Sequence, residues 1–286
     1  MPTYCNRNAA TSTLNTKGNN KTMNNMIKTP ITTQKIQENL IKLTTTDFIN
    51  NIEVFNSINS TSQYLIEKKK QQLQQMQVAI AERQTHGNGT HGKRWSSPPN
   101  TGIWLSFTWS LPINTQWSLA SIAIGYATLQ TLQQFCDSDQ LKLKWPNDIV
   151  YNKQKLAGIL IDSHTDDKYA HLVIGIGINI YPYKHNIDSQ HAALAELSDQ
   201  NLCRNKIIAQ ILFNCYNAII QLQLDQTATI ISNWQAHDAL QDCCVTLKTG
   251  QKITSGKYLG INNNGEMRIL INNILTEIRQ ASIISY

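Results

Sequence analysis

Short apolar runs of strand length, separated by polar turns, occupy most of the chain beyond residue 51. Period-two alternation or β-branched composition predicts strands in the segments 52–55, 78–82, 103–109, 149–151, 156–161 and 171–180. Apolar residues at helical spacing predict helices near residues 60–75, 116–135, 206–222 and 227–234, the first of them capped by Ser60 or Thr61. This arrangement predicts an α+β fold within residues 51–238, with one central mixed β-sheet flanked by helices.

The pattern changes beyond residue 240. Short β-like segments at 245–248, 253–260, 266–271 and 275–279 are separated by turn sequences such as Lys-Thr-Gly and Asn-Asn-Asn-Gly. We therefore expect residues 239–286 to form a small C-terminal β-barrel domain.

Residues 1–50 differ from both of these parts. The first 28 residues are rich in Asn, Thr and Lys and have almost no apolar periodicity, which predicts disorder. A weak helical pattern follows at residues 31–43, where Ile36, Leu40 and Leu43 form a partial stripe. We expect a mostly disordered or weakly helical extension, and Met1, Met23 and Met26 are alternative starts.

Composition narrows the class of protein without identifying it. A net charge of +6 with 15% charged residues is modest, so a nucleic-acid partner is not required. The six cysteines show no C-x-x-C spacing and the seven histidines are scattered, so we predict no zinc site, no disulfide framework and no metal ligands. Because the chain lacks a long apolar run and a signal-peptide core at its start, we expect a cytoplasmic protein without membrane attachment.

Two lysines lie within or beside predicted apolar strands. Lys144 begins the stretch Lys-Trp-Pro-Asn-Asp and Lys155 begins Lys-Leu-Ala-Gly. A buried ammonium group costs desolvation free energy unless it reaches water or an opposing charge. The Trp-Pro step should end regular strand pairing, because proline has no backbone donor, and the following Asn-Asp pair then presents polar groups there. This crowding predicts an anion site, with solvated, outward-facing lysines as the alternative.

A glycine-rich loop follows the predicted strand at residues 78–82. Gly87, Gly89 and Gly92 free the backbone, so successive amide groups can surround an anion. The spacing matches G-x-G-x-x-G and nearly matches a P-loop, but Ser-Ser-Pro-Pro follows where either motif needs a helix. Arg94 also replaces the hydroxyl that a P-loop uses for magnesium. The alternative is a surface loop without a ligand.

A pair of glycines interrupts the β-branched run at residues 171–180. Gly175 and Gly177 are two residues apart, so they face the same side of the sheet and leave it bare. A flat ligand could approach the backbone there, whereas close packing against a helix is the alternative.

Together these segments resemble the biotin protein ligases, in the monofunctional form that lacks a DNA-binding domain. The similar segments occur in the family's order and at similar spacing across residues 52–185, with weaker likeness to the end of the chain. They are Ser60-Thr61, Gln84 with the loop 87–95, the stretches 144–148 and 155–158, and the strand segment 175–179. The resemblance implies the α+β fold described above.

The resemblance also implies a two-step reaction. Biotin and ATP give biotinyl-5′-AMP and pyrophosphate, and the activated carboxyl then passes to a lysine of a biotin carboxyl carrier protein, an acetyl-CoA carboxylase subunit. A carboxylate must approach a polyanion in the first step, which requires positioning and cations. Magnesium would accompany the pyrophosphate. ATP and an acidic carrier are adequate partners for a modestly basic chain.

The residue roles are carried over from the same resemblance. Lys155 resembles the lysine that bridges the biotin carboxyl and the α-phosphate, and Lys144 resembles a second phosphate-facing cation. Asp148 is our hypothesised acceptor or orienter of the attacking amine, which must lose its proton. The expected biotin pocket comprises Ser60, Thr61, Gln84, Gly87, Asn88, Thr90, Gly158, Gly175 and Gly177. The expected ATP-binding residues are Lys93, Arg94, Trp95, Asn147 and Asn179.

Some of these roles agree with elementary chemistry. An indole can stack on a purine, and an asparagine side chain can both donate to and accept from an adenine edge. For Trp95, a role as a core aromatic residue is the alternative.

The chain departs from the family pattern in the glycine loop. Asn88 and Thr90 stand where the family usually carries arginines that help to hold the adenylate, and Ser62 replaces a usual asparagine. We expect an active enzyme that retains its intermediate less tightly, unless nearby side chains substitute for the arginines. The candidates for this substitution are Lys93, Arg94 and His91.

Two alternative functions stay open. A lipoate ligase shares the fold and the adenylation chemistry, and a non-catalytic sensor of biotin or its adenylate could act as a regulator. We expect no DNA binding, because a winged helix-turn-helix needs more ordered residues before Ser60 than the chain offers. A homodimer is compatible with the sequence.

Overall fold

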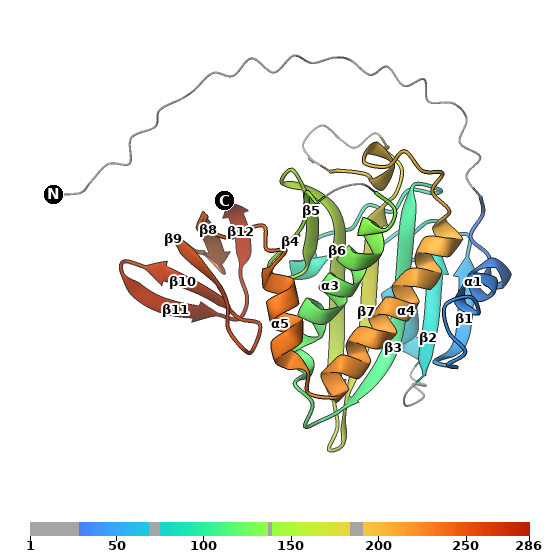
Figure 1. Ribbon diagram of the computed structural model, residues 1–286, viewed down its shortest axis with the longest axis horizontal. Helices are drawn as coiled ribbons and strands as arrows, with labels where there is room; N and C mark the ends of the chain where they lie inside the picture. Colours follow the sequence, from blue (N-terminus) through green and yellow to red (C-terminus); the bar gives the residue numbers. More distant parts are fainter. Residues whose placement is uncertain (1–28, 69–74, 137–138, 184–190) are drawn as a thin grey trace, which may run out of the picture.

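The computed structural model describes residues 29–68, 75–136, 139–183 and 191–286. A seven-stranded sheet forms the larger part, in the order β1-β2-β3-β7-β6-β5-β4 (Figure 1). Strands β1 and β2 are parallel and the other neighbours are antiparallel, so the predicted mixed sheet is confirmed. The strands are β1 Ile49–Phe55, β2 Met76–Ala81, β3 Gly102–Pro112, β4 Leu141–Lys144, β5 Asp148–Tyr151, β6 Gln154–Thr165 and β7 Tyr169–Asn179.

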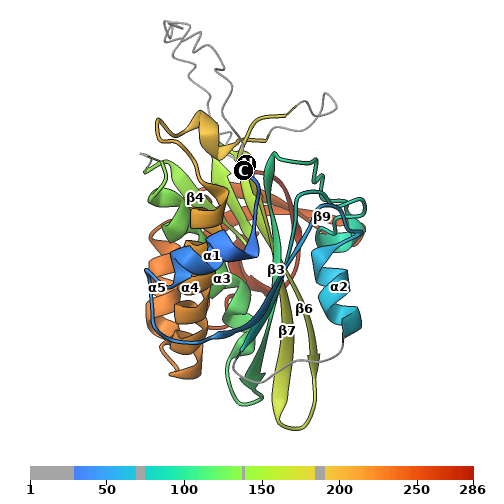
Figure 2. The ribbon, with the colours of Figure 1, turned by 90° about the vertical axis from the view of Figure 1, so that its right-hand side faces the viewer.

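Helices cover both faces of this sheet. Figure 2 shows α3, α4 and α5 on one side of the sheet and α2 on the other, which confirms the predicted α+β fold. The helices are α1 Thr33–Leu40, α2 Thr61–Lys68, α3 Ala120–Gln133, α4 Arg204–Gln223 and α5 Thr227–Gln235. The predicted helix at 116–135 begins instead with a short 3-10 turn, Trp117–Leu119, and the predicted end of the helix at 60–75 falls partly outside the described residues.

The centre of the sheet is buried on both faces. Every residue of β3 from Gly102 to Leu111 is buried, because α2 lies on one side of the strand and α4 on the other. Antiparallel pairing of β3 with β7 places Trp104 opposite Gly177 and Ser106 opposite Gly175. The glycines of β7, which have no side chains, therefore lie beside the hydroxyl group of Ser106.

A buried ion pair joins the start of the described chain to this domain. Arg204, at the beginning of α4, is 1% exposed and donates to both oxygens of Glu82 at 2.6 and 3.0 Å. The Ile31 amide donates to the same carboxylate, and Arg204 also donates to the Thr29 carbonyl. The predicted weak helix at 31–43 is thus confirmed as α1, with Ile36 fully buried. The expected disorder of residues 1–28 and the alternative starts lie outside the described residues.

The C-terminal part is a five-stranded antiparallel sheet with the strand order β11-β10-β9-β8-β12. Its strands are β8 Cys244–Thr249, β9 Lys252–Ile261, β10 Met267–Ile271, β11 Ile274–Ile278 and β12 Ser282–Ser285. The pattern predicted four of these strands, but it missed β12, which has four residues and only two apolar ones. We retain a domain boundary at residue 238 as a proposal.

Hydrogen bonds connect the two sheets at several points. Trp145 donates through Nε1 to the Gly265 carbonyl at 2.9 Å, and Tyr258 donates its hydroxyl to Asp238 at 2.5 Å. Asp238 is 9% exposed and also accepts from the Leu240 amide. These contacts hold the C-terminal sheet beside the site described below.

The pair Asp238–Tyr258 predicts a pH effect on stability. Burial raises the pKa of the Asp238 carboxyl from 3.8 to about 6, although its hydrogen bonds from Tyr258 and Leu240 oppose the shift. Because the folded-state pKa lies above the unfolded one, the group's stabilising contribution is complete below pH 4 and is lost as the pH rises through 6. The free energy of unfolding of Asp238→Asn relative to the wild type should therefore increase by about 2 kcal/mol between pH 4 and pH 7.

Urea denaturation at several pH values measures this difference directly. Asp225→Asn is a suitable control, since Asp225 is exposed in the connection between α4 and α5. A constant difference between Asp238→Asn and the wild type across this pH range would contradict the prediction.

Among the described residues, no helix is both long enough and apolar enough to cross a membrane.

Candidate active site

Two adjoining compartments open on the sheet at β6 and β7. The small one has a free volume of about 40 Å³ and the large one about 570 Å³. Five residues line both: Gly89, Thr90, Trp95, Asn147 and Lys155. The two compartments therefore form one continuous candidate site, with Lys155 at their junction.

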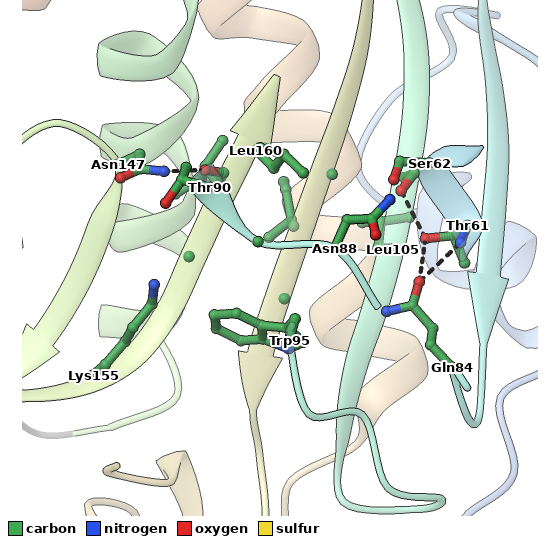
Figure 3. Close-up of a pocket in the computed structure, with 17 residues that line it drawn as sticks. Thr61, Ser62, Gln84, Asn88, Thr90, Trp95, Leu105, Asn147, Lys155 and Leu160 are labelled. Atoms are coloured by element: carbon green, nitrogen blue, oxygen red, sulfur yellow. Dashed lines mark hydrogen bonds between the residues drawn. The ribbon is translucent and has the colours of Figure 1, made fainter. Parts of the chain in front are cut away.

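Polar side chains gather at the end of the small compartment farthest from Lys155 (Figure 3). Gln84 Oε1 accepts from the Thr61 amide at 2.8 Å and from the Thr61 hydroxyl at 3.1 Å, and Thr61 Oγ1 lies 2.7 Å from Ser106 Oγ. Gln84 Nε2 donates to Ser97 Oγ at 3.0 Å. The start of α2, the end of β2 and the middle of β3 thus build one network of amide and hydroxyl groups.

The wall of the small compartment is glycine backbone. A side chain at Gly177 would place its Cβ 2.5 Å from Trp95 Cε2, and one at Gly158 would come within 2.9 Å of both Trp95 and Lys155. At Gly175 the nearest atom to such a Cβ would be Ser106 Oγ, at 3.5 Å. Gly158 and Gly177 are paired across β6 and β7, so the bare strip predicted on β7 continues onto β6.

A register shift brings Lys155 onto the same face as Gly158. Ile149 pairs with Ala157 and Val150 pairs with Lys155, so Leu156 is the extra residue of a β-bulge. In a regular strand, residues three apart would point to opposite faces. The bulge allows Leu156 to be fully buried in the core while Lys155 and Gly158 both line the cavity.

Lys155 is paired with an acid. Its Nζ lies 2.6 Å from Asp148 Oδ1, and the two side chains are 30% and 21% exposed. The same ammonium group lies 4.9 Å from the centre of the Trp95 ring, a distance compatible with a cation–π contact. A cation held between a carboxylate and an indole has a defined position at the junction of the compartments.

Lys144 lines the large compartment together with Lys155 and Asp148. Burial lowers the pKa of the Lys144 ammonium; Asp148 opposes this effect, and the positive charges of Lys155 and Lys93 add to it. The two lysines therefore share one cavity and sense each other's charge, in contrast to the alternative in which each faces solvent separately.

Trp95 lies against Gly177, between Lys155 and the network around Gln84 (Figure 3). Its ring meets Trp104 edge to face, with ring centres 6.4 Å apart. Within the described part of the chain, the buried Trp95 Nε1 has no hydrogen-bond partner. Trp95 is thus both packed against a core aromatic residue and part of the cavity wall.

Most of the predicted site residues line this cavity. The predicted biotin-pocket residues that line the small compartment are Thr61, Gln84, Asn88, Thr90, Gly158, Gly175 and Gly177. The predicted ATP-binding residues Lys93, Arg94, Trp95, Asn147 and Asn179 line the large compartment. Ser60 does not line either compartment, because its hydroxyl contacts Ser62 Oγ and accepts from the Gln63 amide in the first turn of α2.

Gly87 also lies outside the linings. A Cβ at this position would lie 2.6 Å from the Trp95 carbonyl, and the Trp95 amide donates to the Gly87 carbonyl at 2.8 Å. Gly87 therefore supports the loop that carries Trp95.

Sequence reasoning missed several lining residues. Ser106 and Leu160 line the small compartment, and the segment 280–283 of the C-terminal sheet lines the large one. A serine between apolar residues of a buried strand is a usable signal for Ser106, whereas nothing local marks the segment 280–283.

Comparisons with known proteins agree with this geometry. Residues 54–179 match the model of the biotin/lipoate A/B protein ligase family. The chain is 30% identical over 221 residues to the bifunctional ligase/repressor BirA of Escherichia coli strain K12, covering 76% of this chain and 68% of that protein. It is 32% identical over 149 residues to the biotin–[acetyl-CoA-carboxylase] ligase of Mycobacterium tuberculosis, covering 50% of this chain and 54% of that one.

Among solved structures, the biotin protein ligase of Aquifex aeolicus in complex with biotin and ATP superposes with a TM-score of 0.68. The superposition covers 82% of this chain and 98% of the Aquifex chain, at 22% sequence identity, and it therefore shows a shared fold. Fold and sequence together define a protein of the biotin/lipoate ligase class. The chain belongs to the biotin/lipoate A/B protein ligase family and, within it, to the biotin protein ligases.

Proposed function

We propose that this chain activates biotin with ATP to biotinyl-5′-AMP and transfers the biotinyl group to a specific lysine of a biotin carboxyl carrier protein. The observation that carries the proposal is that a small polar-ended compartment and a large basic compartment meet at Lys155. Two substrates bound in these compartments would bring their reacting groups together at one ammonium group.

The small compartment suits biotin. Its network of Thr61, Gln84 and Ser106 offers both donors and acceptors to the ureido group, which itself carries two N–H groups and one carbonyl. The apolar side chain of Leu160, which lies on β6 beside Gly175, would contact the rest of the bicyclic ring. The valeryl chain would then extend along the glycine strip toward Lys155.

The small compartment must widen for this ligand to enter. Its free volume of about 40 Å³ holds little more than one water molecule. The glycine loop contributes Asn88, Gly89 and Thr90 to the lining and covers this compartment, so its displacement is the simplest route of entry.

The large compartment suits ATP. Lys93, Arg94 and Lys144 supply positive charge for the phosphates, while Trp95, Asn147 and Asn179 are the proposed contacts of adenine. A biotin carboxylate oxygen attacks the α-phosphorus, a new P–O bond forms, and the bond to pyrophosphate breaks. Lys155 would neutralise the charge that repels these two anions.

Magnesium is expected to arrive with ATP. Magnesium is usually held by one or two carboxylates together with substrate phosphates. Among the described residues, Asp148 is the carboxylate that lines the large compartment, and no cluster of three potential ligands is found. The residues therefore fit a magnesium ion held mainly by the phosphates, which neutralises their charge.

Asp148 is the proposed proton acceptor in the second step. The lysine of the carrier must attack as a neutral amine, so that its nitrogen forms a bond to the acyl carbon while AMP leaves. Asp148 lines the large compartment and can orient or deprotonate this amine once Lys155 contacts the phosphate.

The direct test supplies the purified chain with biotin, ATP and magnesium. Mass spectrometry should detect biotinyl-5′-AMP, and addition of a biotin carboxyl carrier domain should yield a product biotinylated at one lysine. Absence of the adenylate would refute the proposal. We also expect a cytoplasmic protein, and light scattering would determine whether it forms a homodimer.

Lipoate ligase is the nearest alternative. The polar end of the small compartment favours biotin, because the amide and hydroxyl groups around Gln84 can form hydrogen bonds with a ureido group but not with the sulfur atoms and methylene groups of a dithiolane ring to a similar extent. Competition between biotin and lipoate for adenylation distinguishes the two. A non-catalytic regulator is excluded if label reaches a carrier domain.

Thr90 provides a prediction about retention of the intermediate. It lines both compartments but carries no charge, where the family usually has an arginine. Thr90→Arg should slow release of biotinyl-5′-AMP roughly tenfold or more, because a charge-assisted hydrogen bond to the phosphate is worth about 1.5–3 kcal/mol. Release of radiolabelled adenylate into a trap measures this rate.

Thr45→Arg is the matched control, because Thr45 is exposed in the connection between α1 and β1 and the change adds the same charge. An equal release rate for Thr90→Arg and the wild type would show that Lys93 and Arg94 already supply the missing charge.

A further inference from the structure

Two lysines contact the ring of Tyr286, and one of them, Lys144, lines the large compartment. Lys144 Nζ and Lys153 Nζ each lie 4.9 Å from the centre of its ring. Both distances are typical of a cation–π contact, in which the negative face of the ring attracts an ammonium group. Tyr286 was not among the residues predicted from the sequence, and it follows β12 directly.

The backbone of Tyr286 is held by the turn between β5 and β6. Asn152 and Lys153 have positive φ angles of 46° and 66°, as a tight two-residue hairpin turn requires. From this turn, Lys153 Nζ donates to the backbone oxygen of Tyr286 at 2.7 Å. One lysine therefore contacts both the ring and the backbone of Tyr286, so the position of the ring relative to the main sheet is defined.

The hydroxyl of Tyr286 lies in a buried, charged environment. Within the described part of the chain it has no hydrogen-bond partner. Burial raises the pKa of the phenol, and Cys243 and Asp148 raise it further. The residue therefore reaches from the C-terminal sheet to the neighbourhood of the acid that pairs with Lys155.

The Lys144 ammonium group is stabilised by contact with the Tyr286 ring and by the negative charge of Asp148. Burial and the positive charges of Lys155 and Lys93 destabilise this ammonium group. Long lysine side chains lose considerable rotamer entropy when they are held in one position. A ring against the ammonium restricts these rotamers and offsets part of the desolvation cost.

We propose that Tyr286 is a positioning residue that holds the Lys144 ammonium in the large compartment, so that the C-terminal sheet contributes to binding of the phosphate groups. This inference rests on the proposed function in assigning Lys144 to a phosphate. The ring of Tyr286, which belongs to the C-terminal sheet, keeps the Lys144 ammonium group in place, and Lys153 fixes the position of the ring.

The test compares Tyr286→Phe with Tyr286→Leu in binding of inorganic pyrophosphate, measured by calorimetry. Phenylalanine keeps the aromatic face and should bind within about twofold of the wild type. Leucine keeps apolar bulk without that face and should bind roughly tenfold more weakly, the effect expected for a partly desolvated cation–π contact. Thermal denaturation of each variant checks that it is folded.

A double-mutant cycle with Lys144→Met separates positioning from a general loss of structure. In the Lys144→Met background, Tyr286→Leu should have no further effect on pyrophosphate binding. In a Lys93→Met background, the full tenfold effect should persist. Ile284→Ala is the matched control within the same segment, since Ile284 is 54% exposed.

Lys153→Met should weaken pyrophosphate binding by about two- to threefold, since one contact that fixes the ring is lost. Lys252→Met, at the exposed first residue of β9, removes the same charge and should have no such effect.

Three outcomes would overturn the inference. They are absence of pyrophosphate binding by the wild type, wild-type affinity in Tyr286→Leu, and equal effects of Tyr286→Leu with and without Lys144. Failure of the proposed function is a separate result, because it would appear as pyrophosphate binding without formation of biotinyl-5′-AMP.

Discussion

Lys155→Ala should reduce the rate of biotinyl-5′-AMP formation by roughly a thousandfold, the upper range for loss of one preorganised charge-stabilising group. We expect this large loss of rate because Lys155 lies where the two compartments meet. Without the Lys155 ammonium group, Asp148 would lose its ion-pair partner and would repel the entering carboxylate and α-phosphate more strongly. Pyrophosphate exchange into ATP, followed with radiolabelled pyrophosphate, measures the first step alone.

Two further variants make this result specific. Lys142→Ala removes a lysine from β4 of the same sheet that does not line the cavity, and should leave the exchange rate within about twofold of the wild type. Lys155→Arg retains the charge but not the point-like ammonium geometry, so it should recover only part of the rate. An exchange rate in Lys155→Ala above a tenth of the wild-type rate would contradict the proposed role.

Gly177→Ala should weaken biotin binding by about a hundredfold, equivalent to about 2.7 kcal/mol. A Cβ at this position would lie 2.5 Å from Trp95 Cε2, closer than real Cβ contacts allow. The methyl group of alanine would displace whatever lies against this glycine, which is the Trp95 ring in this structure. Calorimetric titration with biotin measures the loss, and thermal denaturation checks the fold.

Gly175→Ala is the matched control on the same strand and the same face. Its Cβ would lie 3.5 Å from Ser106 Oγ, an ordinary contact, so the ligand-free chain should be unchanged. We expect less than a tenfold loss of biotin affinity for this variant. Equal losses in the two variants would mean that pocket filling, and not displacement at Trp95, decides the effect.

The sequence predicted elements well where one local pattern was strong. The alternation in residues 103–109 and the β-branched run in 171–180 correspond to β3 and β7, which are adjacent strands inside the main sheet. The predictions were weaker at boundaries, because the end of a strand depends on what pairs with it. The strand β12 was missed because its pairing with β8 stabilises four residues that carry little signal of their own.

Local motifs also indicated most of the candidate site. Glycines weaken a strand and buried lysines lose hydration free energy, so both residue types are conspicuous in a predicted strand. In the structure, these glycines and lysines surround one cavity. Ser60 and Gly87 fitted the same motifs but hold helix α2 and the glycine loop instead. A motif identifies residues that are needed together, but it does not separate ligand contacts from the residues that support them.

The sequence by itself determined the periodicity of the elements, the clustering of lysines and glycines in a few segments, and the resemblance to biotin protein ligases. Only the tertiary structure decided that a bulge at Leu156 turns Lys155 toward Gly158, that Asp148 pairs with this lysine, and that Tyr286 reaches Lys144. The physical reason is that periodicity and residue chemistry are local properties. The distance between charges far apart in the chain depends on strand register and on the packing of one sheet against another.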